Sequence, residues 1–330
     1  MSIGAGLSSQ LGAKKETVYG TAAVPVDKFF EYESEGVNFV RNRVESKGLR
    51  AGRTFQSSAR VATTTRGGEG PITMEVPIKG FGFWPDLLVQ PTITPLVVET
   101  TAYKSTYNVG ASDADKSATI QVGKPGTAGT VHPFTYEGCV VTAAKLSCAK
   151  DGFLMYEQSV DVQDRLTATA LATASYTAAN DSFHFGHCAP TVNSVAITDK
   201  FESVNIDMSF ARKTDRWFLG AAGAKAKPIT NAYAAGTIEF GGEFKDLSLT
   251  SLYDADTIFP VIVSWTHTQL AGATAPYSVT VTAAACQMAG DDPNVSGPDV
   301  LSQGMKCTVL DDGTNPPLKI EVVALDTAAW

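Results

Sequence analysis

The sequence has few of the residues on which most catalytic and metal sites depend. Its 330 residues include only four histidines and five cysteines, and 18% of them are charged. The odd number and wide spacing of the cysteines predict free, mostly buried thiols in a chain made in a reducing cytoplasm. The opening "MSIGAGLSSQLGAKKETVYG" has no apolar core of the kind that a secretory signal needs. No run approaches the roughly 18 apolar residues that cross a bilayer, so we expect no membrane segment. The cysteines are Cys139, Cys148, Cys188, Cys286 and Cys307.

Three short stretches resemble ligand sites only in part. "GKPGTAGT" is glycine-rich like a phosphate loop, but its spacing is wrong and no lysine follows its last glycine, so we interpret it as a β-turn. "FHFGHC" brings His184, His187 and Cys188 together, but a zinc site needs a second group of ligands. "DDPNVSG" has calcium-loop spacing, but Gln303 stands where the bidentate carboxylate belongs. We therefore expect no metal, no cofactor and no enzymatic activity.

What the sequence does contain is the pattern of β-strands. In "KFESVNIDMSFAR" the apolar residues Val204, Ile206 and Met208 alternate with polar ones, which is typical of a half-buried strand. Turn-forming stretches such as "DDGTNPP" separate such runs. Only "KGFGFWPDLLVQ" and "KDLSLTSLYDAD" indicate helices, and both are short. The sequence therefore predicts a mainly β, antiparallel fold with short flanking helices.

Two parts of the chain are similar to each other. The stretch "DKFFE" at 27–31 recurs as "DKFE" at 199–202, and "GPITMEVPIK" at 70–79 aligns with "GTIEFGGEFK" at 236–245. The alignment requires a change of offset between these stretches, and length differences between duplicated units collect in loops. We interpret the chain as two tandem β units, residues 1–178 and 179–330, joined by the Ala/Thr-rich "TATALATASYTAAN".

The charge of the chain is unevenly distributed. The formal net charge is −8, yet residues 41–66, here called the basic segment, carry seven cations and one acid. The basic segment thus has a net charge of +6 and the remainder −14, which suggests a surface that meets nucleic acid or an acidic protein face. Its position between two aligned strands predicts a long loop. Its cations are Arg41, Arg43, Lys47, Arg50, Arg53, Arg60 and Arg66.

Acidic residues alternate just before the basic segment. Glu31, Glu33 and Glu35 are expected on one face of a single strand, with Phe30 and Tyr32 on the other. A solvated strand face is one explanation. The other is a surface that repels DNA phosphates, such as the wall of a DNA conduit.

The sequence resembles the tail tube proteins (major tail proteins) of long-tailed, non-contractile bacteriophages. The resemblance rests on the opening "IGAGLSSQLGAKKETVYGTAAVPVDKFFEYESEGVNFVRNRVESKGLRAGR" and on "KGFGFWPDLL", "VGKPGTAGTVHPFTYEGCVV" and "KTDRWFLGA". It implies a tail-tube-type β-sandwich that contributes strands to a large β-barrel, in rings that stack into a conduit for DNA ejection. It also implies a virion protein made in the host bacterial cytoplasm.

The resemblance further implies a set of partners. The basic segment becomes the loop that contacts the neighbouring ring, and residues 1–26 become an N-terminal arm that contacts adjacent subunits. If the repeat is real, three chains form a pseudo-hexameric ring; otherwise six chains do. Tape-measure, tail-terminator and baseplate proteins are the other expected partners, and genome DNA passes through the lumen without specific binding.

Three other functions are compatible with parts of the sequence. A nucleic-acid-binding β protein could use the basic segment, but Phe55 is the only aromatic residue there and the chain is acidic. A carbohydrate-binding sandwich would need exposed aromatic residues, whereas Trp84, Trp217, Trp265 and Trp330 lie in segments that look buried or terminal. A baseplate or tail-tip protein of the same fold is the alternative within phage tails.

Overall fold

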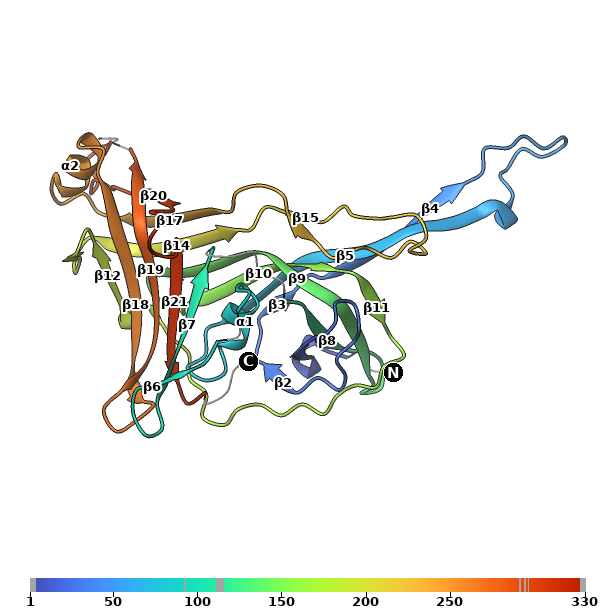
Figure 1. Ribbon diagram of the computed structural model, residues 1–330, viewed down its shortest axis with the longest axis horizontal. Helices are drawn as coiled ribbons and strands as arrows, with labels where there is room; N and C mark the ends of the chain where they lie inside the picture. Colours follow the sequence, from blue (N-terminus) through green and yellow to red (C-terminus); the bar gives the residue numbers. More distant parts are fainter. Residues whose placement is uncertain are drawn as a thin grey trace.

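The chain folds into a β-rich body from which one long hairpin projects (Figure 1). This computed structural model describes residues 4–91, 93–110, 116–290, 292–293, 295 and 297–326. Nineteen strands belong to one sheet, and every pairing within it is antiparallel. The prediction of a mainly β fold is confirmed.

Eight consecutive strands of this sheet form a layer that runs through both halves of the chain. We call it the eight-strand layer. In spatial order it contains β4 (Asn38–Glu45), β5 (Val61–Glu75), β10 (Met155–Val162), β9 (Val131–Ala149), β14 (Phe201–Ser209), β17 (Ala235–Gly242), β20 (Met305–Leu310) and β19 (Pro276–Ala289). The two halves are joined directly, because β9 pairs with β14.

Most of the other strands branch from two strands of this layer, β9 and β19. Through β9 the sheet continues into β8 (Ala118–Pro125), β1 (Gln10–Lys15), β2 (Lys28–Phe30) and β11 (Asp164–Leu166). Through β19 it continues into β18 (Ile258–Leu270), β12 (Cys188–Val192), β13 (Val195–Ala196), β21 (Leu318–Ala324), β7 (Tyr103–Val109) and β6 (Leu96–Val97). Short β3 (Ser34–Glu35) pairs with β5, and β15 (Arg212–Lys213) pairs with β16 (Ile229–Thr230).

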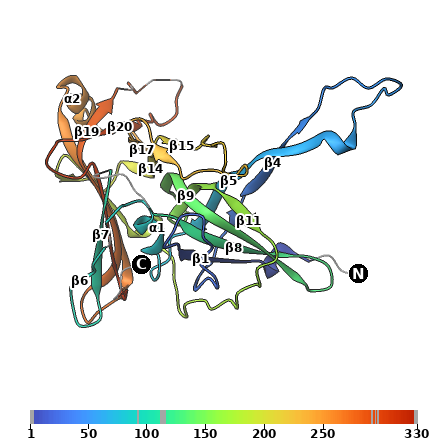
Figure 2. The same cartoon turned by 45° about the vertical axis from the view of Figure 1, so that its right-hand side comes forward.

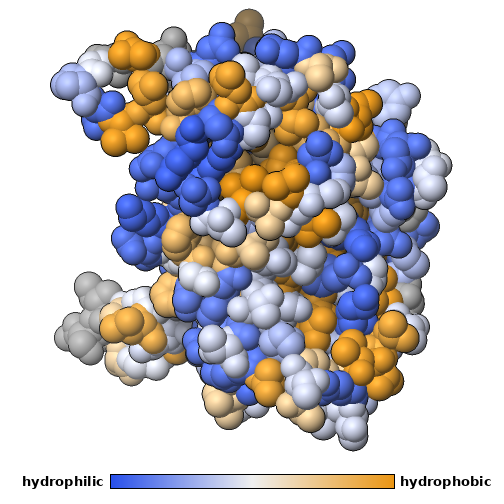
Figure 3. Space-filling view, turned by 90° about the vertical axis from the view of Figure 1, so that its left-hand side faces the viewer, coloured by the Kyte–Doolittle hydropathy of each residue, from blue (hydrophilic) through white to orange (hydrophobic). Residues whose placement is uncertain are grey.

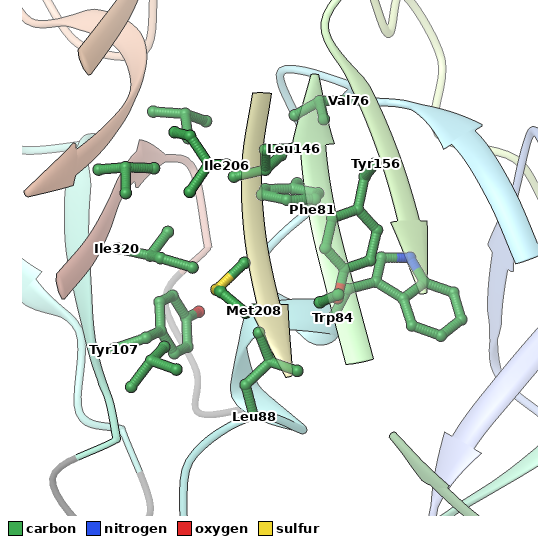
Figure 4. Close-up of a cluster of buried hydrophobic side chains, with 14 of the residues drawn as sticks. Val76, Phe81, Trp84, Leu88, Tyr107, Leu146, Tyr156, Ile206, Met208 and Ile320 are labelled. Atoms are coloured by element: carbon green, nitrogen blue, oxygen red, sulfur yellow. The ribbon is translucent and has the colours of Figure 1, made fainter. Parts of the chain in front are cut away.

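The core lies on one face of the eight-strand layer and is continuous between the halves. Val204, Ile206 and Met208 of β14 are buried and the polar residues between them are not, as the alternation predicted. Figure 4 shows Ile206 and Met208 between side chains of the first half, such as Leu146, and Ile320 of the second. Burying this shared apolar surface stabilises both halves together.

Both α-helices of the described residues lie within the segments predicted to be helical. α1 (Phe83–Asp86) is wholly buried, and its Trp84 ring lies 4.7 Å from that of Phe30, between ring centroids. α2 (Ser248–Asp254) buries only Leu249. The 3₁₀ turns are η1 (Gly6–Ser8), η2 (Ser58–Arg60) and η3 (Phe185–His187).

The N-terminal segment departs from the expected arm. β1 lies between β8 and β2, and its Leu11 and Ala13 are fully buried. The expectation of an N-terminal arm over residues 1–26 is therefore wrong for residues 10–15, and residues 1–3 lie outside the described part of the chain. Alternating apolar residues over so short a stretch are a weak signal for a central strand.

The two halves pair their strands in the same order. The series β5, β10, β9, β8, β1, β2 is matched by β17, β20, β19, β18, β12, β13. A short helix follows β5 and another follows β17. The segment over 167–180 forms neither helix nor strand.

The end of the molecule remote from the hairpin presents a mixed surface. Figure 3 shows this side, where apolar and hydrophilic side chains form small interspersed patches. Strand β18 contributes to the mixture, because its buried and less buried residues alternate along most of its length. This face therefore has the usual composition of a solvated protein surface.

Candidate functional site

The basic segment forms most of the projecting hairpin. Strands β4 and β5 pair as far out as Glu45 and Val61, so only residues 46–60 connect them. The prediction of one long loop over 41–66 is therefore wrong at both ends, where regular strand pairing continues. Leu49 and Phe55 in the connection are almost fully exposed, and the hairpin extends clear of the body in both views (Figures 1 and 2).

Six of the seven cations of the basic segment are free to meet another molecule. Arg41, Arg43, Lys47, Arg50, Arg53 and Arg60 are exposed. Arg66 instead lies at the base of the hairpin, where its Nε donates to Asp164 at 2.7 Å. The structure thus brings Lys47, Arg50 and Arg53 together at the tip and assigns Arg66 to an internal ion pair.

The base of the hairpin is held by the loop that joins β14 to β17 in the second half. The indole of Trp217 donates to the carbonyl of Arg66 at 3.1 Å, and the Arg66 N–H donates to the carbonyl of Gly223 at 3.0 Å. Lys225 makes a buried ion pair with Asp161 of β10. Burial raises the pKa of Asp161, and the Lys225 ammonium opposes that rise. These contacts fix the direction in which the hairpin leaves the body.

The acidic residues before the hairpin do not form the predicted row. β2 ends at Phe30 and β3 covers only Ser34–Glu35, so Glu31, Glu33 and Glu35 do not share one strand. Glu31 and Glu33 are exposed, but Glu35 binds Lys124 with 2.5 Å between Oε1 and Nζ. Sequence alternation did not reveal that the chain bends between β2 and β3.

Glu35 belongs to a small network at the edge of the eight-strand layer. Its Oε2 accepts the N–H of Val37 at 3.2 Å, and the hydroxyl of Tyr136 donates to the Val37 carbonyl at 3.3 Å. Burial lowers the pKa of Lys124, but its hydrogen bond to Glu35 and the Glu35 charge outweigh burial and raise the pKa overall. Burial also raises the pKa of Tyr136, so its hydroxyl keeps the proton that it donates. We call Glu35, Lys124 and Tyr136 the edge network.

The face of the eight-strand layer opposite the core is polar and carries both positively and negatively charged residues. Lys145 and Asp207 lie opposite each other on β9 and β14, with 3.7 Å between charged atoms, and Lys306 pairs with Glu239. Glu33 lines a hollow beside this face together with Ser203 and Asn205. We call this surface the polar face.

Two of the three stretches that partly resemble ligand sites have ordinary structural roles. "GKPGTAGT" spans the end of β8 and the turn into β9, as predicted for a turn. The rings of His184 and His187 contact each other at a tilt beside β18, with centroids 3.7 Å apart. No group of His, Cys, Asp or Glu in the described residues is arranged to hold a metal ion. Asn294 and Ser296 of the calcium-like stretch lie outside the described residues, as does Trp330, whereas Trp84 and Trp265 are fully buried.

These features define a class of protein: a β-rich scaffold from which a cationic hairpin projects, an arrangement suited to contact with other proteins. The sequence profile of the family described as "Phage tail tube protein" matches residues 6–309, and the chain belongs to this family. It is therefore a structural protein of the phage tail tube and a component of the virion, as the resemblance implied. A comparison with curated proteins gives no significant match. In the described part of the chain, no helix is both long and apolar enough to span a membrane.

Proposed function

We propose that the protein closes into rings, and that the rings stack into the tube through which the genome is ejected. The main support is the eight-strand layer, which among the described residues has no strand paired with the outer edge of β4 or with the outer edge of β19 beyond Gln287. Rings remove such edges, which otherwise promote aggregation. A second support is the projecting hairpin, because head-to-tail contacts between rings can propagate along a filament.

We further propose that each ring contains three chains and has pseudo-sixfold symmetry. The layer consists of four strands from each half, β4–β5–β10–β9 and β14–β17–β20–β19, in the same pairing order. Residues 1–178 and 179–330 would then be tandem units, each occupying one of six similar positions. A ring of six full-length chains is the alternative and would have twice as many units.

The lumen of such a ring would be lined by the polar face. Paired charges such as Lys145 with Asp207 leave no broad basic surface on which DNA phosphates could bind. Glu33 stays a candidate lumenal acid beside this face, and so does the exposed Glu31. The ion pair of Glu35 with Lys124 and its position opposite the buried Ile72 argue against a lumenal role for Glu35.

The tip of the basic segment would bind acidic surface on the next ring. Its exposed cations and the acidic remainder of the chain are complementary, and charge complementarity fixes the register of such contacts. Tape-measure, tail-terminator and baseplate proteins would bind the ends or the lumen of the stack. Synthesis in the host cytoplasm agrees with the free cysteines, four of which are buried.

Negative-stain electron microscopy of the purified, concentrated protein is the test of this function. We expect hollow rings or tubes, and averaged end-on views with threefold symmetry on a near-sixfold outline. Strict sixfold averages, with six chains per ring by mass, would contradict the tandem-unit arrangement. Particles that stay monomeric at every concentration would contradict spontaneous ring closure.

A further inference from the structure

The two strands at the outer ends of the eight-strand layer are the counterparts of the two strands that pair with each other in its middle. In the middle of the layer, β14 of the second half pairs with β9 of the first. At the ends, the counterpart of β14 is the strand formed by β3 and β4, and the counterpart of β9 is β19. Among the described residues, no strand pairs with the outer edge of β3 and β4, or with the outer edge of β19 beyond Gln287.

The internal junction specifies which residues correspond. On β14, Met208 lies opposite Gly236, and on the matching strand Val37 lies against Gly70, the residue aligned with Gly236 in the sequence. Val37 is therefore the counterpart of Met208. The residue of β19 that matches a given residue of β9 is found by following two successive strand pairings in each half. Ile72, Gln158 and Ala144 lie side by side on β5, β10 and β9, as do Ile238, Cys307 and Met288 on β17, β20 and β19.

Because Met208 lies opposite Ala144 at the internal junction, Val37 is the residue that should face Met288. We infer that the edge at Val37 binds strand β19 of a second copy of this chain, antiparallel, with Val37 opposite Met288. Gly36 then faces Ala289 and Glu35 faces Gly290 of that copy. This inference rests on the proposed ring and adds the interface and register through which it closes.

The edge network occupies this binding edge in the free chain. Glu35 accepts the Val37 N–H and Tyr136 donates to the Val37 carbonyl, so both main-chain groups already have partners. A pairing strand offers the same two hydrogen bonds from its own backbone. The network therefore protects the edge until a second copy replaces it, much as other proteins protect exposed edges against unwanted pairing.

Cysteine cross-linking tests the register. Directly opposite residues of an antiparallel pair have Cβ atoms about 4.5–5.5 Å apart, within reach of a short reagent with two thiol-reactive groups. We expect Val37→Cys/Met288→Cys protein, once assembled, to give covalent dimers and trimers with no larger product. The matched control Val37→Cys/Ala289→Cys, one residue out of register, should give at most one-tenth of the product, and the unaltered protein should give none.

The outcomes separate the register from the ring itself. If microscopy shows rings but the in-register pair cross-links no better than the control, the register is wrong and the ring stands. If the cysteine variant does not assemble, hydrogen exchange on the unaltered protein decides. The amides of Val37 and Met288 should become at least tenfold better protected on assembly, and unchanged exchange of both in assembled rings would overturn the inference.

The protecting role of the network has its own test. Glu35→Ala removes the acceptor for the Val37 N–H and should speed ring formation at least threefold, measured by light scattering at equal concentration. Glu33→Ala removes a neighbouring exposed acid and serves as the control. We expect this variant to form rings at the same rate as the unaltered protein. Equal rates for both variants would show that the network does not limit assembly.

Discussion

Reversing the charge of two arginines, as Arg50→Glu/Arg53→Glu, is expected to abolish stacking of rings while leaving each chain folded. Both residues are exposed at the tip of the projecting hairpin, remote from the core. Substitutions at such positions usually change the free energy of unfolding by less than about 0.5 kcal/mol. Bringing like charges together at an interface costs several kcal/mol, so repeated contacts along a tube cannot form. Electron microscopy should show single rings, and thermal unfolding of the free chain should be unchanged.

The matched control for this variant is Arg50→Lys/Arg53→Lys, which keeps both charges and should form tubes. Tubes of normal length from the charge-reversed protein would remove the docking role of the basic segment. If both pairs of substitutions abolish stacking, the contact depends on the geometry of the guanidinium groups rather than on charge, since lysine cannot make their planar paired hydrogen bonds.

Asp86→Ala is expected to cause the largest loss of stability among single substitutions of charged residues. Asp86 is fully buried in α1, between the Lys15 ammonium at 2.9 Å and the Lys116 ammonium at 2.8 Å. Burial lowers the pKa of Lys116, and Asp86 is the group that favours its charged form. Without the carboxylate, two partly buried cations repel each other. Breaking a buried ion pair in this way costs about 3–5 kcal/mol, measured as the free energy of urea unfolding.

The ion pair of Asp27 with Lys14 supplies the control for that measurement. It has a similar distance, 3.1 Å, but both side chains are substantially exposed. Asp27→Ala should therefore cost less than about 1 kcal/mol. If Asp86→Ala and Asp27→Ala lose equal free energy of unfolding, burial does not increase the contribution of the Asp86 ion pairs to stability.

Much of the fold could be predicted because its signals are local. Alternating residues on β14, the turn between β8 and β9, and both short helices are encoded within a few neighbouring positions. The two arginines at the tip could be found from charge density alone. The alignment of 70–79 with 236–245 also placed Ile72 and Ile238 at matching positions of the sheet.

The residues that the sequence misassigned depend on contacts between distant segments. Arg66 resembles the other cations of the basic segment, but Asp164, far along the chain, binds it at the base of the hairpin. Glu35 resembles Glu31 and Glu33, but Lys124 and the bend after β2 remove it from their surface. The pattern of charges within a strand contains no information about such partners.

The sequence by itself determined the β class, the positions of the turns, the excess of positive charge in one segment and the family. These follow from side-chain periodicity, backbone preferences and composition, which act over short distances along the chain. Only the tertiary structure decided that the basic segment is a paired hairpin and that one layer runs through both halves. It also paired Glu35 with Lys124 and left the strand edge at Val37 open to another strand. Strand pairing brings together residues more than a hundred positions apart, and their register is set by the shared core rather than by any local sequence.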